Sequence, residues 1–132
     1  MKLAAFSLLV PDYDAGIAFF CKGLGFTLTE DVDQGHKRWV TVAPRAGNIR
    51  LVLARAEDAA QRTALGNQAG LGNQAGGRVW LFLQTDDFAR DAARITAAGG
   101  VFEEAPRHEP YGTVAVWRDP FGNRWDLIEP VR

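Results

Sequence analysis

Hydrophobic residues in the first half of the chain are spaced first as in a strand and then as in a helix. The apolar stretch LAAFSLLV predicts a strand over residues 3–10. Ile17, Phe20 and Leu24 then recur at helical spacing, which predicts a helix over residues 14–24. Further apolar segments predict three more strands, near residues 26–33, 37–43 and 49–55.

The second half of the chain repeats this pattern. A shift of 75 residues aligns Asp12 with Asp87 and Gly25 with Gly100. The repeat predicts one strand and one helix followed by three strands, over residues 78–85, 88–98, 101–105, 112–118 and 123–129. Asp-Pro-Phe-Gly-Asn joins the last two strands and is a strong turn sequence, because proline presets one backbone angle and glycine or asparagine accepts a positive one. The chain is therefore predicted to be an α+β protein of two tandem βαβββ modules.

A segment rich in glycine, asparagine and glutamine separates the two halves. Within it the hexapeptide LGNQAG occurs twice in tandem, and it offers little to bury, which is typical of a flexible linker. We place module one at residues 1–56, the linker at 57–77 and module two at 78–132 of one domain. The duplication is interpreted as a tolerated insertion, since longer loops cost little extra entropy. Alternatively, the longer linker changes how modules pair, within one chain or between two.

Composition narrows the possible partners. The chain has 132 residues, a formal net charge of -1 and no cluster of basic residues, so neither nucleic acid nor a membrane surface is expected as a partner. Its apolar runs are far shorter than the roughly 20 residues that span a bilayer. Cys21 is the single cysteine, which excludes an internal disulfide and a cysteine-based metal site. A cytoplasmic location is the default expectation.

Three segments carry a resemblance to a known superfamily. They are LLVPDYDAGIAFFCKGLGF, LFLQTDDFARDAARITAAGG and the closing DPFGNRWDLIEP. In this order they resemble the vicinal oxygen chelate superfamily, which includes glyoxalases, bleomycin-resistance proteins and extradiol dioxygenases. The resemblance implies a glyoxalase/bleomycin resistance/dihydroxybiphenyl dioxygenase-like fold, with sheets curved into a cup, and a homodimer. It does not specify a reaction, because one fold hosts many chemistries.

The resemblance also implies where a metal would bind. Enzymes of the superfamily take His, Glu or Gln ligands from the first and last strands of each module, positions that correspond here to Ala5, Leu51, Trp80 and Asp126. Only Asp126 carries an oxygen donor. Even an open catalytic site usually keeps three protein ligands, so we predict no metal and no cofactor. Whether the chain is an enzyme stays open.

The strands predict an apolar, aromatic cup. Side chains alternate between the faces of a strand, and we assign Leu51 and Leu53 of the fourth strand to the cup face. The predicted ligand-pocket residues are Ser7, Leu51, Trp80, Phe82, Gln84, Arg124 and Asp126, with Tyr111 near the mouth of the cup. Asp126 is interpreted as a partner of an arginine or water, as a contact to a ligand, or, if burial raises its pKa, as a general base.

Three hypotheses for function follow. The first is a metal-independent protein that binds a small apolar or aromatic molecule in this cup. The second is a superfamily enzyme, a lyase, isomerase or dioxygenase, with an atypical metal site. The third is a non-catalytic assembly or regulatory module, whose own side chains fill the cup.

Overall fold

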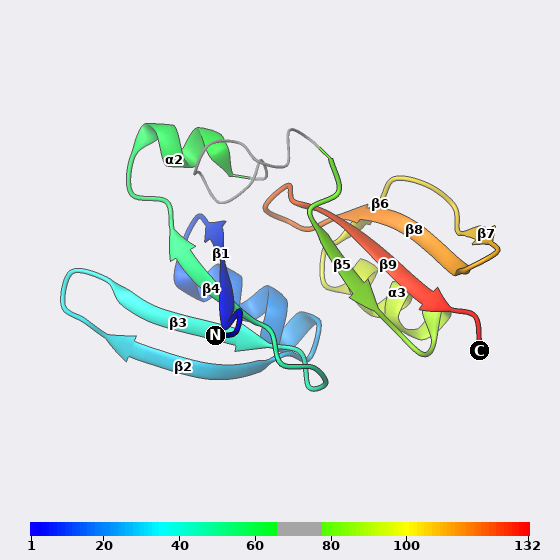
Figure 1. The fold of residues 1–132 in the computed structure, drawn as a ribbon. Coiled ribbons are helices and arrows are strands. Elements are labelled where there is room, and N and C mark those ends of the chain that lie inside the picture. The colour runs from blue at the N-terminus through cyan, green and yellow to red at the C-terminus, as the bar shows by residue number, and fades with distance from the viewer. Residues whose placement is uncertain (66–77) are drawn as a thin grey trace.

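The chain folds into two sheets that lie side by side, each with helices against one of its faces (Figure 1). The structure is a computed structural model that describes residues 1–65 and 78–132. The first sheet has four strands in the order β1-β4-β3-β2, and the second has five, in the order β5-β9-β8-β6 with β7 paired to β8. No helix in the described part of the chain has both the length and the hydrophobicity that crossing a membrane requires.

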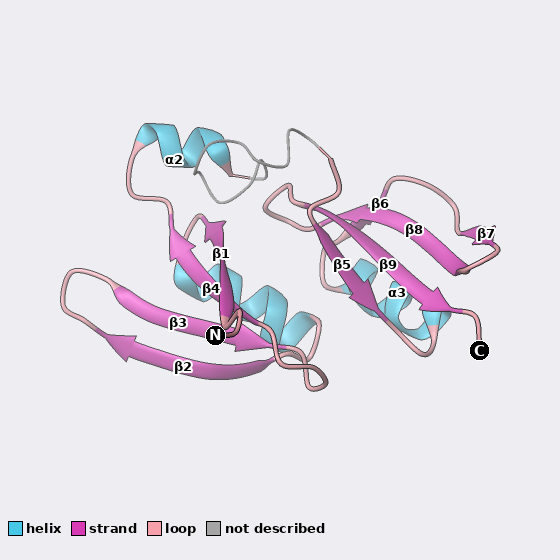
Figure 2. Cartoon of the chain, viewed as in Figure 1, coloured by secondary structure: helices cyan, strands magenta, loops and turns pink. Residues whose placement is uncertain are grey.

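The elements follow the predicted βαβββ order in both halves (Figure 2). Those of the first half are β1 (Ala5–Val10), α1 (Tyr13–Ile17), η1 (Ala18–Gly23), β2 (Thr27–Asp33), β3 (Arg38–Ala43) and β4 (Arg50–Arg55). Those of the second half are β5 (Leu81–Gln84), α3 (Phe88–Ala97), β6 (Val101–Phe102), β7 (Arg107–Glu109), β8 (Gly112–Arg118) and β9 (Arg124–Pro130). The prediction of a two-module α+β fold is thus confirmed, and the short β7 is an addition to it.

A helix that the sequence did not predict lies inside the proposed linker. It is α2 (Ala59–Ala64), and the side chain of Asp58 caps its first turn by accepting a hydrogen bond from the Gln61 amide at 2.8 Å. The tandem LGNQAG copies, apart from Leu65, lie outside the described residues.

The first helix changes from α to π geometry at Ala18. In η1 the backbone bonds widen, as shown by the Leu24 amide donating to the Phe19 carbonyl at 3.0 Å. The wider turn lets the neighbours Phe19 and Phe20 both point inward, with 5% and 0% of their surface exposed. Regular α spacing had placed only Phe20 inside.

These two phenylalanines join the modules into one core. Phe19 packs on Trp117 with ring centroids 6.2 Å apart, and Phe20 packs on Trp125 at 6.0 Å. Trp117 and Trp125, from β8 and β9, stack on each other at 5.2 Å. Both indoles are almost fully buried, so the core crosses the boundary between the sheets.

One predicted orientation is wrong. The parallel β1–β4 register pairs Leu51 with Phe6 and Leu53 with Leu8, so both leucines share the helix-side face and are buried there. Val52, which pairs with Ser7, occupies the opposite, open face. The cause is a turn: residues 44–49 between β3 and β4 are one residue longer than 119–123 between β8 and β9. One extra residue in a turn moves each side chain of the following strand to the opposite face of the sheet.

Candidate functional site

An apolar cavity of about 590 Å³ lies where the two modules meet. Its lining comes from β1, β4, β5 and the β3–β4 turn, and we name it the seam cavity. The side chains that define it are Phe6, Phe26, Ile49, Leu51, Trp80, Leu81, Phe82, Leu83, Gln84 and Trp125. This volume falls within the range of about 300–1,000 Å³ that is common for small-molecule sites.

The strands β1 and β5 form the aromatic wall of the seam cavity. Each is the outer strand of its sheet, so the edges of both sheets border the junction. The ring of Phe6 stands edge-on to Trp80 with centroids 6.2 Å apart. The Trp80 amide donates to the Arg124 carbonyl at 2.9 Å, which ties the backbone before β5 to β9. Phe82 keeps 69% of its surface exposed, so an apolar ring is available to a ligand.

The indole N–H of Trp80 is a donor without an acceptor. Its nitrogen is buried and makes no hydrogen bond to any described residue. A buried polar group left unsatisfied costs about 1–3 kcal/mol.

The structure brings together half of the predicted pocket residues. Leu51, Trp80, Phe82 and Gln84 all line the seam cavity. The other four lie elsewhere, Ser7 on the open face of the first sheet, Arg124 and Asp126 on that of the second, and Tyr111, 52% exposed, in the β7–β8 turn. Phe6 and Phe26 also line the cavity but were not predicted, because strand alternation gives no information about how two sheets meet.

Asp126 lies on the open face of the second sheet, paired across it with Phe82 and Val116. One of its carboxylate oxygens is buried and accepts no hydrogen bond from the described residues. Burial raises the pKa of Asp126, while the positive charges of Arg107 and Arg124 oppose that rise.

The metal positions implied by the resemblance do not fit a metal ion. Ala5, Leu51 and Trp80 have no donor for a metal, and Leu51 faces away from Asp126. Val52, the open-face residue that corresponds to Asp126, has none either. In the described ranges no three His, Cys, Asp or Glu side chains form a group that could hold a metal ion.

Both open faces carry the same ion pair instead. In the first sheet Arg50 binds Glu30 at 2.7 Å, and in the second Arg124 binds Glu103 at 2.6 Å. In both modules the arginine is the first residue of the last strand. The pairs neutralise charge on the faces where related enzymes would bind metal.

A second cavity, of about 550 Å³, adjoins the seam cavity. The two share the lining residues Phe26, Pro44, Ala46, Leu83 and Gln84. Its far end is charged and contains Arg45, Arg90 and Arg94 together with Asp86 and Asp91, and we name it the arginine cavity.

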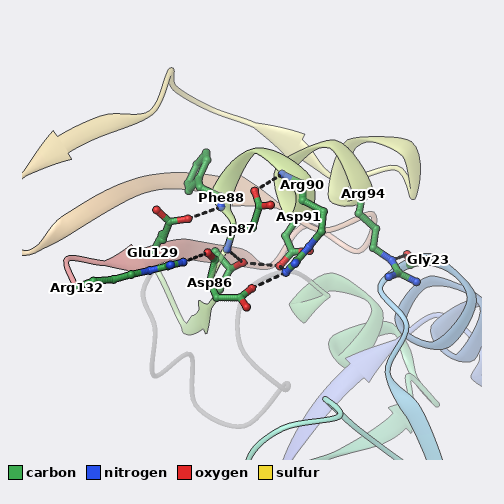
Figure 3. Close-up of polar contacts among 10 residues, drawn as sticks. Gly23, Asp86, Asp87, Phe88, Arg90, Asp91, Arg94, Glu129 and Arg132 are labelled. Carbon is green, nitrogen blue, oxygen red and sulfur yellow. Dashed lines mark hydrogen bonds and ion pairs between the residues drawn. The ribbon is translucent and has the colours of Figure 1, made fainter.

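Polar contacts at the start of α3 build this charged end (Figure 3). Arg90 binds Asp86 at 2.7 Å and Asp91 at 2.9 Å, and its hydrogen bonds hold the pKa of both carboxyls below their usual range. Asp87 caps the helix by accepting from the Arg90 amide at 3.0 Å, and Glu129 accepts from the Phe88 amide at 2.8 Å. The helix start is therefore satisfied by protein groups.

Two βαβββ modules with a shared core and a cavity at their junction define a class of paired-module α+β proteins. The family profile described as "Glyoxalase/Bleomycin resistance protein/Dioxygenase superfamily" matches residues 2–127, and the chain belongs to this family. The resemblance found in the three sequence segments is thereby confirmed.

Similar proteins include one close in sequence and two solved structures. An uncharacterized protein of Shewanella frigidimarina is 47% identical over 126 residues, which cover 93% of this chain and 89% of that protein. The structure of UcmS2 is 28% identical, covers 97% of both chains and has a TM-score of 0.78. TnmS3, described as an antibiotic binding protein from Streptomyces sp. CB03234, is 29% identical, with 99% and 97% of the chains covered and a TM-score of 0.73.

Proposed function

We propose that this chain is a metal-independent small-molecule-binding protein whose ligand, an apolar or aromatic molecule, occupies the seam cavity. The observation that carries the proposal is the cavity itself, about 590 Å³ and lined by aromatic and aliphatic side chains. Burial of one large apolar side chain gives about 1.5–3 kcal/mol, so a ring placed against Phe82 and Trp80 would bind favourably. The description of the similar TnmS3 as an antibiotic binding protein supports the same class of function.

The donor chemistry of the chain supports binding without a metal. Aliphatic, aromatic and guanidinium side chains stand at or beside the positions that hold ligands in related enzymes, and Asp126 is the single carboxylate among them. The proposed ligand therefore makes mainly apolar contacts in the seam cavity.

The proposal includes a homodimer. Helical segments cover one face of each sheet, while the open faces and the unpaired sheet edges offer a surface to a second copy of the chain. Unpaired outer strands tend to be covered in natural proteins. Light scattering after size exclusion is expected to give twice the 14.5 kDa chain mass, and a monomer at micromolar concentration would refute this part.

Ligand binding can be tested with a panel of aromatic and polycyclic compounds. At least one compound should quench tryptophan fluorescence saturably and raise the melting temperature, with no effect of a chelator. Trp80→Ala should abolish the response because it removes an aromatic wall of the seam cavity. Trp39→Phe is the matched control, since it also removes an indole but lies outside this cavity. The proposal fails if no compound binds, if binding requires a divalent metal, or if Trp80→Ala binds normally.

A further inference from the structure

We infer that the ligand is an amphipathic monoanion, an aryl or alkyl carboxylate, with its apolar part in the seam cavity and its carboxylate in the arginine cavity. This rests on the proposed function and adds the chemical class of the ligand. The seam cavity and the arginine cavity are continuous. Phe26, Pro44, Ala46, Leu83 and Gln84 line both cavities, so one elongated molecule can occupy the two together.

The arginine cavity carries a net positive charge. Three arginines and two aspartates line it, which leaves one positive charge in excess. Arg90 is neutralised by its ion pairs with Asp86 and Asp91. In the described residues neither Arg45 nor Arg94 has a carboxylate within 4.0 Å, and Arg94 interacts with Asp91 only through longer-range charge attraction. An excess of one charge matches a monoanion, while the two aspartates disfavour a more highly charged group such as a phosphate dianion.

Arg94, from the second module, is held in place by the first module. Its Nε donates to the Gly23 carbonyl at 3.0 Å, so the guanidinium is anchored by one nitrogen. Gly25 has a positive φ of 77°, and a Cβ there would come within 2.7 Å of Arg94 Nη2. Glycine therefore gives the guanidinium room to lie against the backbone. A preorganised guanidinium matches the planar fork of a carboxylate.

One polar side chain connects the two ends of the site. Gln84 lines both cavities with a side-chain amide that can donate a hydrogen bond. An apolar molecule without oxygen would leave this donor unused. A carboxylate with an aromatic or alkyl body satisfies the charge at one end and the apolar surface at the other.

The test compares carboxylates with neutral analogues of the same shape. Isothermal titration of the full chain would use 2-naphthoate against 2-naphthalenemethanol, and decanoate against decanol. The carboxylates are expected to bind about tenfold more tightly than the alcohols, because a charged hydrogen-bond partner is lost in each alcohol. Arg45→Gln should weaken only the carboxylates, and Arg94→Lys, which keeps the charge but not the fork, should weaken them as well. Arg62→Gln, an exposed arginine of α2, is the matched control and should change neither.

The outcomes separate the inference from the proposed function. Equal affinity for acid and alcohol, both lost in Trp80→Ala, would overturn the inference and leave the apolar site intact. Carboxylate binding that Arg45→Gln and Arg94→Lys leave unchanged would place the anion elsewhere and also overturn it. If neither acids nor alcohols bind the folded protein, the inference is overturned, and the proposed function fails with it only if the wider compound panel also contains no ligand.

Discussion

Replacement of Asp119 by alanine is expected to destabilise the protein more than any exposed aspartate does. Asp119 is 3% exposed and begins the turn between β8 and β9. One carboxylate oxygen accepts hydrogen bonds from the amides of Phe121 and Asn123, both at 2.9 Å. The other accepts from the Asn123 side chain at 2.9 Å and from the Trp125 indole at 3.0 Å. Alanine would leave four donors without this acceptor.

The size of the effect follows from these four donors. A hydrogen bond to a charged group contributes about 1.5–3 kcal/mol, and such contributions are not additive. A buried donor left without its acceptor costs about 1–3 kcal/mol, and these costs do not add fully over the four donors, so we expect about 3–5 kcal/mol for Asp119→Ala. For a chain of this length, the melting temperature should fall by about 10–20 °C.

Urea unfolding followed by tryptophan fluorescence and by circular dichroism would measure this change. Asp12→Ala is the matched control, because Asp12 caps α1 through one exposed hydrogen bond to the Ala15 amide, worth about 1 kcal/mol. A loss for Asp119→Ala no larger than that of the control would show that water replaces the carboxylate easily, and the argument from buried donors would be refuted.

Two further predictions concern pH and packing. Burial raises the pKa of Asp126, so just above pH 4 the native state still holds a proton that the unfolded chain has lost. Asp126 therefore lowers the free energy of unfolding as the pH rises from about 4 through the raised pKa of the native state. Asp126→Asn should therefore match the wild type in melting temperature at pH 3.5 and exceed it at pH 7; equal values at both would contradict the shift. Gly100→Ala would bring a Cβ within 3.1 Å of Trp117 and into contact with Ile95, at an expected cost of about 1–3 kcal/mol. In an Ile95→Ala background the same change should cost less, and a cost independent of the background would rule out this contact.

The sequence predicted the order of elements because each module buries one side of its strands and one face of its helix. The spacing of apolar residues that results, every second residue in a strand and every three to four in a helix, is local and can be counted along the chain. The facing of Leu51 was wrong because it was transferred by a constant spacing of 75 residues. The turn at residues 44–49 is longer by one, so Val52, and not Leu51, corresponds to Asp126. The number of residues in a turn determines which side chains of the next strand point to each face of the sheet. It therefore determines which side chains a ligand contacts.

The candidate site was only partly predictable for a different reason. Trp80, Phe82 and Gln84 were identified from one strand, whose alternation was clear. Phe6 and Arg94 belong to different modules and reach the site through the way the two modules pack. That packing depends on Phe19, which enters the core because η1 widens the helix. No local pattern in the sequence indicated the π turn.

The aromatic contacts of Phe19 and Phe20 also bear on how this architecture could have arisen by duplication. A half-length chain with such phenylalanines would expose them to water, and it would need the tryptophans of another copy to cover them. Fusion of two copies makes that encounter intramolecular and raises the effective concentration of each half for the other. In a fused chain the two halves can differ, as Val52 and Asp126 do at corresponding positions, without losing the partner on which each depends. The intermodule aromatic core thus links the stability of the two halves while leaving their open faces free to change.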